Sequence, residues 1–280
     1  MSYKTILVHL DGGEGSAKRL EVALGLAETF DAHLVGLLGL RHAYIPSFAI
    51  AEAGATIVSS VERRRAETAR AAEAAFRAAT ARHDRSAAEW RISHLDALVA
   101  TRLSARYADL VVVGQKDPGG EESSGAGPDF AEELVLSAGR PVLLVPYAGR
   151  FAVVGRRILV AWNAGREAAR AVTDALPLLT RADAVHVVAF NPDKGGADHG
   201  DTPGADIGLY LARHGVKVSV AQQQNEELAV GEQILSRAAD LSVDLIVMGA
   251  YGHSRVRELM LGGATRTLLD SMTVPVLMSH

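Results

Sequence analysis

The sequence predicts an α/β protein built from two tandem domains, each a doubly wound, Rossmann-like sheet of five parallel strands, related by a pseudo-twofold axis. Short apolar runs rich in β-branched residues, which are typical of buried strands, alternate with segments of helical periodicity. This series of elements occurs twice along the 280 residues, and each series closes with a Pro-Val-Leu strand, at Pro141 and at Pro275. Regular alternation of strands and helices indicates a parallel sheet with helices on both faces.

The first strand, helix and second strand are repeated without a gap. Thr5–Leu10 reads as a buried strand, Ser16 is the expected N-cap of a helix that runs to about Phe30, and a second strand lies within 31–40. The second copy, RILVAWNAGREAARAVTDALPLLTRADAVHVVAF, begins at Arg157 and has Asp183-Ala184 in the place of Asp31-Ala32. We therefore infer a tandem duplication, with domains at 1–148 and 155–280.

The last strands of the two halves also correspond. YADLVVVGQ, at 107–115, matches SVDLIVMGA, at 242–250, and RPVLLVP, at 140–146, matches VPVLMSH, at 274–280. Third strands are expected at 89–93 and 216–222. The closing strands are expected at sheet edges, where they pair the two halves within the chain or pair two chains in a homodimer.

The first half is the longer one, and its extra residues are expected within 43–83. The first part of that stretch, Tyr44–Val58, is apolar and mixed, and the second part is rich in Ala, Arg and Glu, which predicts a helix with a solvated charged face. Tyr44–Val58 either packs against the domain or forms a lid or a partner surface.

Bulk properties exclude several classes of protein. The net charge of −4 argues against a nucleic-acid partner, and the absence of cysteine excludes disulfides, thiol catalysis and cysteine-based zinc sites. No apolar run approaches the roughly 18 residues of a membrane span. An acidic residue at position 11 comes too soon for a signal peptide, so we expect a cytoplasmic protein that does not associate with membranes.

The segment DLIVMGAYGHSRVRELMLGGATRTLL, at 244–269, combines a strand, glycines and the start of a helix. Its glycines are Gly249, Gly252, Gly262 and Gly263, and the helix is expected to start near Ala264. Glycines let a backbone approach a ligand closely, and the first turn of a helix leaves N–H donors unpaired, so the segment predicts a phosphate site. The alternative is that Gly249 and Gly252 only shape a βα turn.

The whole chain resembles a tandem member of the universal stress protein family. The resemblance rests on ILVHLDGG and ILVAWNAG as first strands, on ADLVVVG and VDLIVMG, on the Gly249–Gly262 spacing and on the closing strands. It implies a stress-response protein that binds ATP or ADP, with or without Mg²⁺, in the second half. The implied nucleotide contacts are Met248, Gly249, Gly252, Gly262, Gly263 and Ala264 around the phosphates, and Ala161, Trp162, Asn163, Val188 and Ala189 near the adenine.

The two halves depart from the family pattern in different ways. The first half keeps Asp11 but has an acid-rich, proline-interrupted stretch after Gly114, which repels phosphate. The second half keeps the glycines but has Asn163 where the family has an acid, and Asn supplies no charge for a metal. It also has Gly263 where a Ser or Thr usually follows the last glycine, and Thr265 is a local substitute for that hydroxyl.

No residue is a convincing catalyst. His9 and Asp11 share a strand face, as an acid–base pair or, more simply, as a packed histidine beside an acid. No set of His, Asp and Glu has metal-ligand spacing, so at most weak ATP hydrolysis is expected. The alternative function is a scaffold, or a protein that binds a small or hydrophobic ligand at the insertion of the first half.

Overall fold

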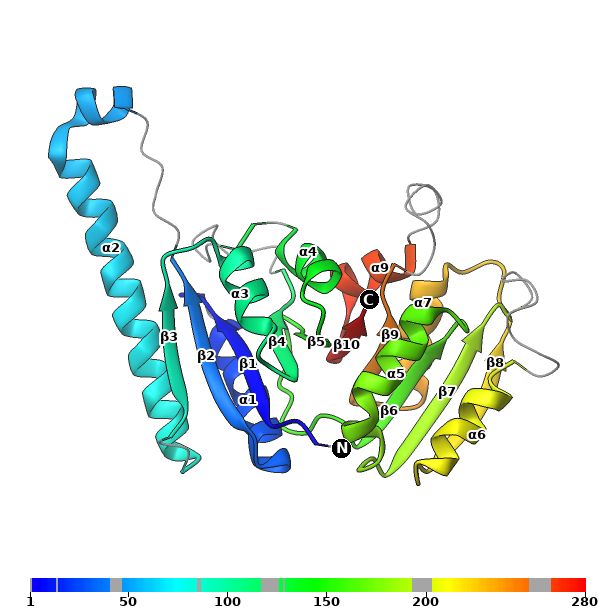
Figure 1. The fold of residues 1–280 in the computed structure, drawn as a ribbon. Coiled ribbons are helices and arrows are strands. Elements are labelled where there is room, and N and C mark those ends of the chain that lie inside the picture. The colour runs from blue at the N-terminus through cyan, green and yellow to red at the C-terminus, as the bar shows by residue number, and fades with distance from the viewer. Residues whose placement is uncertain are drawn as a thin grey trace.

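The computed structural model describes residues 2–13, 15–40, 47–84, 87–116, 126–127, 129–192, 203–251 and 263–280, without the side chains of 47–58 and 61. One ten-stranded sheet runs through the molecule in the order β3-β2-β1-β4-β5-β10-β9-β6-β7-β8 (Figure 1). Its strands are β1 (Thr5–Leu10), β2 (His33–Gly39), β3 (Glu89–Ser93), β4 (Leu110–Gly114), β5 (Val142–Val145), β6 (Arg157–Trp162), β7 (Ala184–Phe190), β8 (Val218–Gln223), β9 (Leu245–Gly249) and β10 (Val276–Ser279).

Within each half, neighbouring strands are parallel. The two halves meet where β5 and β10 pair antiparallel, with Leu143 opposite Leu277. The predicted pair of five-stranded parallel sheets is confirmed, and so is the prediction that the closing strands join the halves within the chain. The homodimer stays a prediction.

Helices cover both faces of the sheet. They are α1 (Gly15–Phe30), α2 (Ser47–Arg82), α3 (Ala97–Ala105), α4 (Phe130–Ser137), α5 (Arg166–Leu179), α6 (Ala205–Arg213), α7 (Val230–Asp240) and α9 (Gly263–Ser271). Alternate residues of a strand point to opposite faces. Ile6 and Val8 of β1 therefore lie in the core beneath α1 and α5, while Leu7 lies in the core beneath α3, α4, α7 and α9.

Helix α2 accounts for the greater length of the first half. It has 36 residues, whereas its counterpart α6 has 9, and it extends past the end of β3 (Figure 1). Phe76 anchors it, with its ring centroid 5.2 Å from that of Trp90. The apolar part of the insertion, Tyr44–Val58, lies outside the residues whose side chains are described, so the lid or partner surface expected there stays a prediction.

The C-terminal end of α2 is joined to α1 by ionic contacts. The two ring nitrogens of His83 lie 2.6 Å from a carboxylate oxygen of Glu28 and 3.1 Å from one of Glu21, and Arg82 donates to Glu21 at 2.8 Å. The hydrogen bond with Glu28 raises the pKa of His83. Helix α2 is thus held by an apolar contact with β3, through Phe76, and by ionic contacts with α1, through Arg82 and His83.

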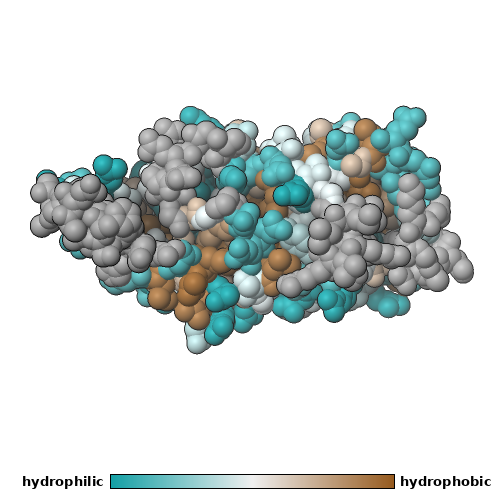
Figure 2. Space-filling model, turned by 90° about the horizontal axis from the view of Figure 1, so that it is seen from above, coloured by the Kyte–Doolittle hydropathy of each residue, from teal (hydrophilic) through white to brown (hydrophobic). Residues whose placement is uncertain are grey.

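The outer surface mixes polar and apolar groups. Exposed large hydrophobic side chains of the described residues include Ile92, Leu95 and Leu103 of the β3–α3 region. Seen from above, apolar patches lie between hydrophilic groups (Figure 2). No helix in the described ranges combines the length and the apolar character that crossing a bilayer requires.

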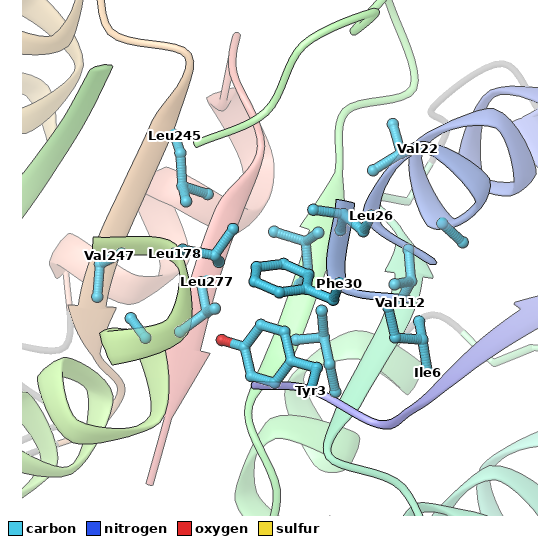
Figure 3. Close-up of a cluster of buried hydrophobic side chains, with 14 of the residues drawn as sticks. Tyr3, Ile6, Val22, Leu26, Phe30, Val112, Leu178, Leu245, Val247 and Leu277 are labelled. Atoms are coloured by element: carbon cyan, nitrogen blue, oxygen red, sulfur yellow. The ribbon is translucent and has the colours of Figure 1, made fainter. Parts of the chain in front are cut away.

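The seam between the halves is packed and hydrogen-bonded. Figure 3 shows Phe30 and Leu26 of α1 pointing toward Leu178 of α5 and Leu277 of β10. The Tyr3 ring lies 4.9 Å from that of Phe30, and its hydroxyl donates to the carbonyl of Asp174 at 2.7 Å. Burial raises the pKa of Tyr3. The hydrogen bond from Tyr3 to Asp174 joins the first half to the second, and the Phe30 ring holds the Tyr3 ring in place for it.

We expect Tyr3→Phe to lower the free energy of unfolding by about 1 kcal/mol, because the hydrogen bond from the buried Tyr3 to the carbonyl of Asp174 is lost. Urea denaturation measures this difference. Tyr107→Phe is the matched control, because Tyr107 is 80% exposed, and it should leave the stability unchanged. Equal effects of the two substitutions would contradict a role for the seam hydrogen bond.

Candidate functional site

Three of the expected nucleotide contacts form a row across the carboxyl ends of the strands in the second half. Ala161 of β6 lies opposite Met248 of β9 on one side and opposite Val188 of β7 on the other. All three belong to the side of the sheet that α7 and α9 cover. Met248 and Val188 are buried, and Ala161 is partly exposed. The structure therefore brings an apolar wall together at the strand ends nearest α9.

The next residues along the same strands lie on the opposite face. Trp162 pairs in register with Ala189, and Trp162 packs against the core beneath α5. Ala189 is fully buried. Strand alternation separates both residues from the row of Ala161, so only part of the expected adenine set is gathered on one side.

The turn after β6 is built like the turn after β1. Asn163 is exposed, and its side-chain oxygen accepts a hydrogen bond from the Gly165 N–H at 3.0 Å. In the first half, the Asp11 carboxylate accepts from the Gly13 N–H at 2.9 Å. The duplication therefore extends to the hydrogen bonds of the turn, and Asn163 keeps the turn-forming function of the acid without its charge.

Close packing between β9 and α5 requires a glycine at position 249. A Cβ at this position would lie 2.5 Å from the carbonyl carbon of Glu167 and 2.9 Å from its Cβ, because the first turn of α5 approaches β9 closely. This close packing of α5 on β9 requires a glycine at 249 whether or not a ligand binds there. Gly249 also lets the end of β9 stay next to the β6–α5 turn, where the strand order switches and ligands bind in such sheets.

Glu167 is a residue of this crevice that sequence reasoning missed. Its side chain is only 4% exposed, and it pairs with the exposed Arg166 at 2.5 Å. The first half has Gly15 at the corresponding position, so the repeat does not mark this residue. An acid in the first turn of a helix is also common, because it interacts favourably with the helix dipole. A Cβ at Gly165 would lie 3.1 Å from Asn163 Oδ1 and 3.4 Å from Glu167 Oε2, so the Glu167 carboxylate lies on the same side of the turn as the Asn163 amide.

Helix α9 presents its N-terminus to the same end of the sheet. Gly263 is exposed, and a Cβ there would meet no atom of the described residues within 4 Å, apart from the backbone of its own helix. Ala264 is partly exposed, whereas Thr265 is 7% exposed and points into the core side of the helix. Gly252 and Gly262 lie outside the described residues. A helix N-terminus with an open glycine is suited to an anion, because its first N–H groups have no partner within the helix.

The corresponding crevice of the first half is occupied by an internal ion pair. Arg19 of α1 lies 2.7 Å from the Asp11 carboxylate, and both side chains are 8% exposed. Arg19 also donates to the His9 carbonyl at 3.2 Å and to the Ser16 hydroxyl at 2.9 Å. A side chain at Gly114 would overlap the guanidinium, so Arg19 lies directly beneath the end of β4.

Ser16 belongs to this cluster, and its expected function as the N-cap of α1 is wrong. The helix already includes Gly15, and the Ser16 hydroxyl lies 2.7 Å from both the carbonyl and the carboxylate of Asp11. The Asp11 N–H donates back to the same hydroxyl at 2.9 Å. The Ser16 hydroxyl is therefore engaged with Asp11, at the centre of the polar cluster, and does not cap the helix.

Apart from Asp11, whose counterpart is Asn163, the side chains that fill this crevice have alanine at the corresponding positions of the second half. The gapless match of the first strands and helices pairs His9 with Ala161, Ser16 with Ala168 and Arg19 with Ala171. Pro141 and Pro275 align the last helices, which pairs Phe130 with Ala264. In the first half, the rings of His9 and Phe130 lie 4.7 Å apart and both are buried, whereas Ala161 and Ala264 are partly exposed. Among the described residues, two rings fill the first crevice, and alanines stand at the corresponding positions of the second.

Burial governs the ionisation of the filled crevice. Burial and the charge of Arg19 lower the pKa of His9 to about 4, and His9 Nε2 has no hydrogen-bond partner among the described residues. Burial opposes ionisation of Asp11, but Arg19, His9 and the hydrogen bonds from Ser16 and Gly13 hold its pKa below the usual value. The cluster therefore contains a neutral imidazole beside an Asp–Arg ion pair. Neither group has a pKa near 7, so the cluster is not suited to acid–base catalysis near neutral pH.

We expect stability to fall as the pH is lowered from the ordinary histidine pKa toward about 4, the folded-state pKa of His9. Below the ordinary histidine pKa, His9 of the unfolded chain binds a proton that buried His9 of the folded chain does not. The free energy of unfolding is therefore highest above the unfolded-state pKa and falls as the pH drops below it. The loss is on the order of 3 kcal/mol. Urea denaturation at pH 7 and pH 4 measures it, and His9→Leu should remove it. An equal loss in the variant would contradict the assignment to His9.

Two cavities lined by described residues lie away from this crevice. One of about 430 Å³ lies between α1 and α5, and one of about 610 Å³ lies beside the start of β2 and the end of α2. Within the described residues, no group of three acidic or histidine side chains is arranged to hold a metal ion.

Comparison with known proteins assigns the family. The model of the Universal stress protein family matches residues 2–146 and 155–280. Universal stress protein Slr1230 of Synechocystis is 26% identical over 176 residues, which span 60% of this chain and 57% of that protein. A universal stress protein of Archaeoglobus fulgidus has the same fold, with a TM-score of 0.63 at 18% identity over 98% of this chain and 95% of the other.

A second solved structure, that of the functionally unknown protein PA1789 of Pseudomonas aeruginosa, agrees with a TM-score of 0.58 at 16% identity, over 99% of this chain and 92% of the other. At these identities the solved structures establish the fold alone. The double family match covers both halves of the repeat seen in the sheet. The chain belongs to the universal stress protein family, as a member with two tandem repeats.

Proposed function

We propose that this protein is a stress-response protein whose second half binds an adenine nucleotide, ATP or ADP, between the ends of β6 and β9 and the start of α9. The observation that carries the proposal is the contrast between the two crevices. Within the part of the chain that the structure describes, the rings of His9 and Phe130 close the first one, whereas their counterparts in the second, Ala161 and Ala264, are alanines that remain partly exposed. Ligands bind in this position, outside the carboxyl ends of the strands, in doubly wound sheets.

The phosphates are assigned to the N-terminus of α9. Gly263 and Ala264 present small side chains there, and the helix has 9 residues, enough for its dipole to favour an anion. Thr265 is buried, so we propose backbone N–H groups rather than its hydroxyl as the main phosphate donors. Gly249, Gly252 and Gly262 complete the proposed phosphate loop.

The adenosine is assigned to the row of Ala161, Val188 and Met248, where a flat base would lie on the partly exposed Ala161 and the buried Val188 and Met248 would support it from beneath. Asn163 is exposed at the end of β6 and can hydrogen-bond the ribose or the base. Trp162 and Ala189 are proposed to support this wall from the opposite face. The amide of Asn163 brings no charge, so we expect Mg²⁺ to change nucleotide affinity by less than a few-fold.

No described residue of the second crevice is placed as a general base for water. Glu167 is buried and paired with Arg166. We therefore expect binding with at most slow hydrolysis of ATP, because proton transfer to a positioned base contributes about 10²–10⁴-fold to such rates.

Ala264→Phe tests the proposal, because it installs in the second half the residue that closes the first. We expect calorimetric titration with ADP to give one site per chain, and the variant to bind at least about tenfold more weakly, a loss of about 1.4 kcal/mol. The ring would occupy the space over Ala161.

Phe130→Ala is the matched control, since it makes the reverse exchange in the first half. It should leave both the number of sites and the affinity of the remaining site unchanged. Undiminished ADP binding by Ala264→Phe, or loss of binding in the control alone, would contradict a site in the second half.

A further inference from the structure

Arg157, His186 and Ser219 form a polar cluster on the side of the sheet that α7 covers. In register, His186 of β7 lies between Leu159 of β6 and Ser219 of β8. Leu159 belongs to the core beneath α7 and α9, so its register partners point to that side, as does Arg157, two residues before it. Arg157 is the first residue of β6. The cluster therefore lies at the amino ends of the strands, whereas the proposed nucleotide site lies at their carboxyl ends.

Helix α7 adds a second arginine to this cluster. Ile234 and Ala238 are buried on the side of α7 that packs on the sheet. Arg237 follows Ile234 by three residues and precedes Ala238, so it lies at the edge of the same helix face. Its side chain is partly exposed, but its Nε is buried and has no hydrogen-bond partner among the described residues. The helix thus directs a cation toward the sheet and leaves one of its donors unpaired.

Arg157 reaches the same end of α7. Its Nη2 donates to the carbonyl of Leu241 at 2.6 Å, and the N–H of Leu241 donates to the carbonyl of Arg237 at 3.1 Å. The carbonyl of Leu241 uses one of the five N–H donors of the guanidinium. Burial, and then the positive charges of Arg157 and Arg237, lower the pKa of His186. Both guanidinium groups are therefore close enough to the imidazole to oppose its protonation.

The positive charge of the cluster has no partner in the part of the chain that the structure describes. No carboxylate there forms an ion pair with the side chain of Arg157 or Arg237. The Asp244 carboxylate interacts with the charge of Arg157, but it is already bound by backbone N–H groups of 155–157. Nε2 of His186 is also buried without a partner. Unpaired buried polar atoms cost free energy, so an anion from solution would complete this cluster.

The first half has the arginine of the helix without the rest of the cluster. Arg102 of α3 lies three residues before the end of its helix, as the arginine of α7 does, and its Nε is likewise buried without a partner among the described residues. In the gapless match of the first strands, Thr5 takes the place of Arg157. Leu34 takes the place of His186 in the second strand. The convergence of three basic side chains is therefore specific to the second half.

We propose that Arg157, His186, Ser219 and Arg237 form an anion site that binds a phosphate group, which belongs to inorganic phosphate or to a small phosphate ester. The two guanidinium groups are its charged donors. Ser219 is exposed, and its hydroxyl lies 2.8 Å from Nδ1 of His186, so it adds a neutral donor. A phosphate suits the site better than a carboxylate does, because its several oxygens and its second charge match donors that come from β6, β8 and α7.

The test follows the imidazole resonances of His186 by NMR while inorganic phosphate is titrated into the full chain at pH 7 and constant ionic strength. His186→Gln assigns these resonances, and the local signal separates this site from the nucleotide crevice. We expect a saturable change, and at least about tenfold weaker binding by Arg237→Gln, which loses a charged donor. Arg157→Gln should act in the same direction. Arg102→Gln is the matched control, and it should bind phosphate as the wild type does.

The charge of the ligand is tested with sulfate, a tetrahedral dianion that does not titrate in the range of histidine. Bound sulfate offsets the two guanidinium charges, so it should raise the pKa of His186 in the wild type and leave it unchanged in Arg237→Gln. Glycerol 3-phosphate identifies the source of the phosphate group. Tighter binding of this ester than of inorganic phosphate assigns the site to phosphate esters, and the reverse order assigns it to the free anion.

Three results would overturn the proposal. They are a His186 resonance that phosphate does not change in a saturable way, phosphate binding that Arg237→Gln leaves intact, and an equal loss of binding in Arg102→Gln. A pKa of His186 that sulfate does not raise would overturn it as well. Circular dichroism and thermal unfolding verify that the variants fold.

Discussion

The antiparallel pairing of β5 with β10 sets the geometry of the whole molecule. Each half alone would end in an open strand edge, which is a template for unwanted pairing. The pairing of Leu143 with Leu277 joins the two edges and makes one ten-stranded sheet. It also brings α1 and α5 side by side, so that Tyr3 and Phe30 pack into a shared core and a cavity remains at the rim of the seam.

The duplicated halves have equivalent crevices at the ends of their strands. The two crevices differ in the side chains that line them. In the first half, Arg19 neutralises Asp11 from within, and the rings of His9 and Phe130 close the remaining room. In the second half, alanines occupy these positions, and Asn163 keeps the turn without its charge. The difference between the two copies therefore lies in side-chain volume and charge, and the proposed nucleotide site depends on that difference.

Much of the fold is readable from the sequence, because buried parallel strands are continuous apolar runs. Thr5–Leu10, which reads TILVHL, is a strand at the predicted residues. The site is less readable. An arginine in an amphipathic helix looks like surface, so the sequence does not reveal that Arg19 reaches Asp11. The contact of His9 with Phe130 depends on packing between distant segments, and strand alternation, which separates Trp162 from Ala161, outweighs their adjacency in sequence.

The division between a filled and an open crevice is tested most directly by photolabelling with 8-azido-ATP, followed by mass spectrometry of the peptides. The account predicts that the label is found in the second half, on peptides containing the ends of β6, β7 or β9 or the start of α9, and that excess ADP prevents it. Label that ADP displaces from the ends of β1 and β4, beside Arg19 and Asp11, would contradict it.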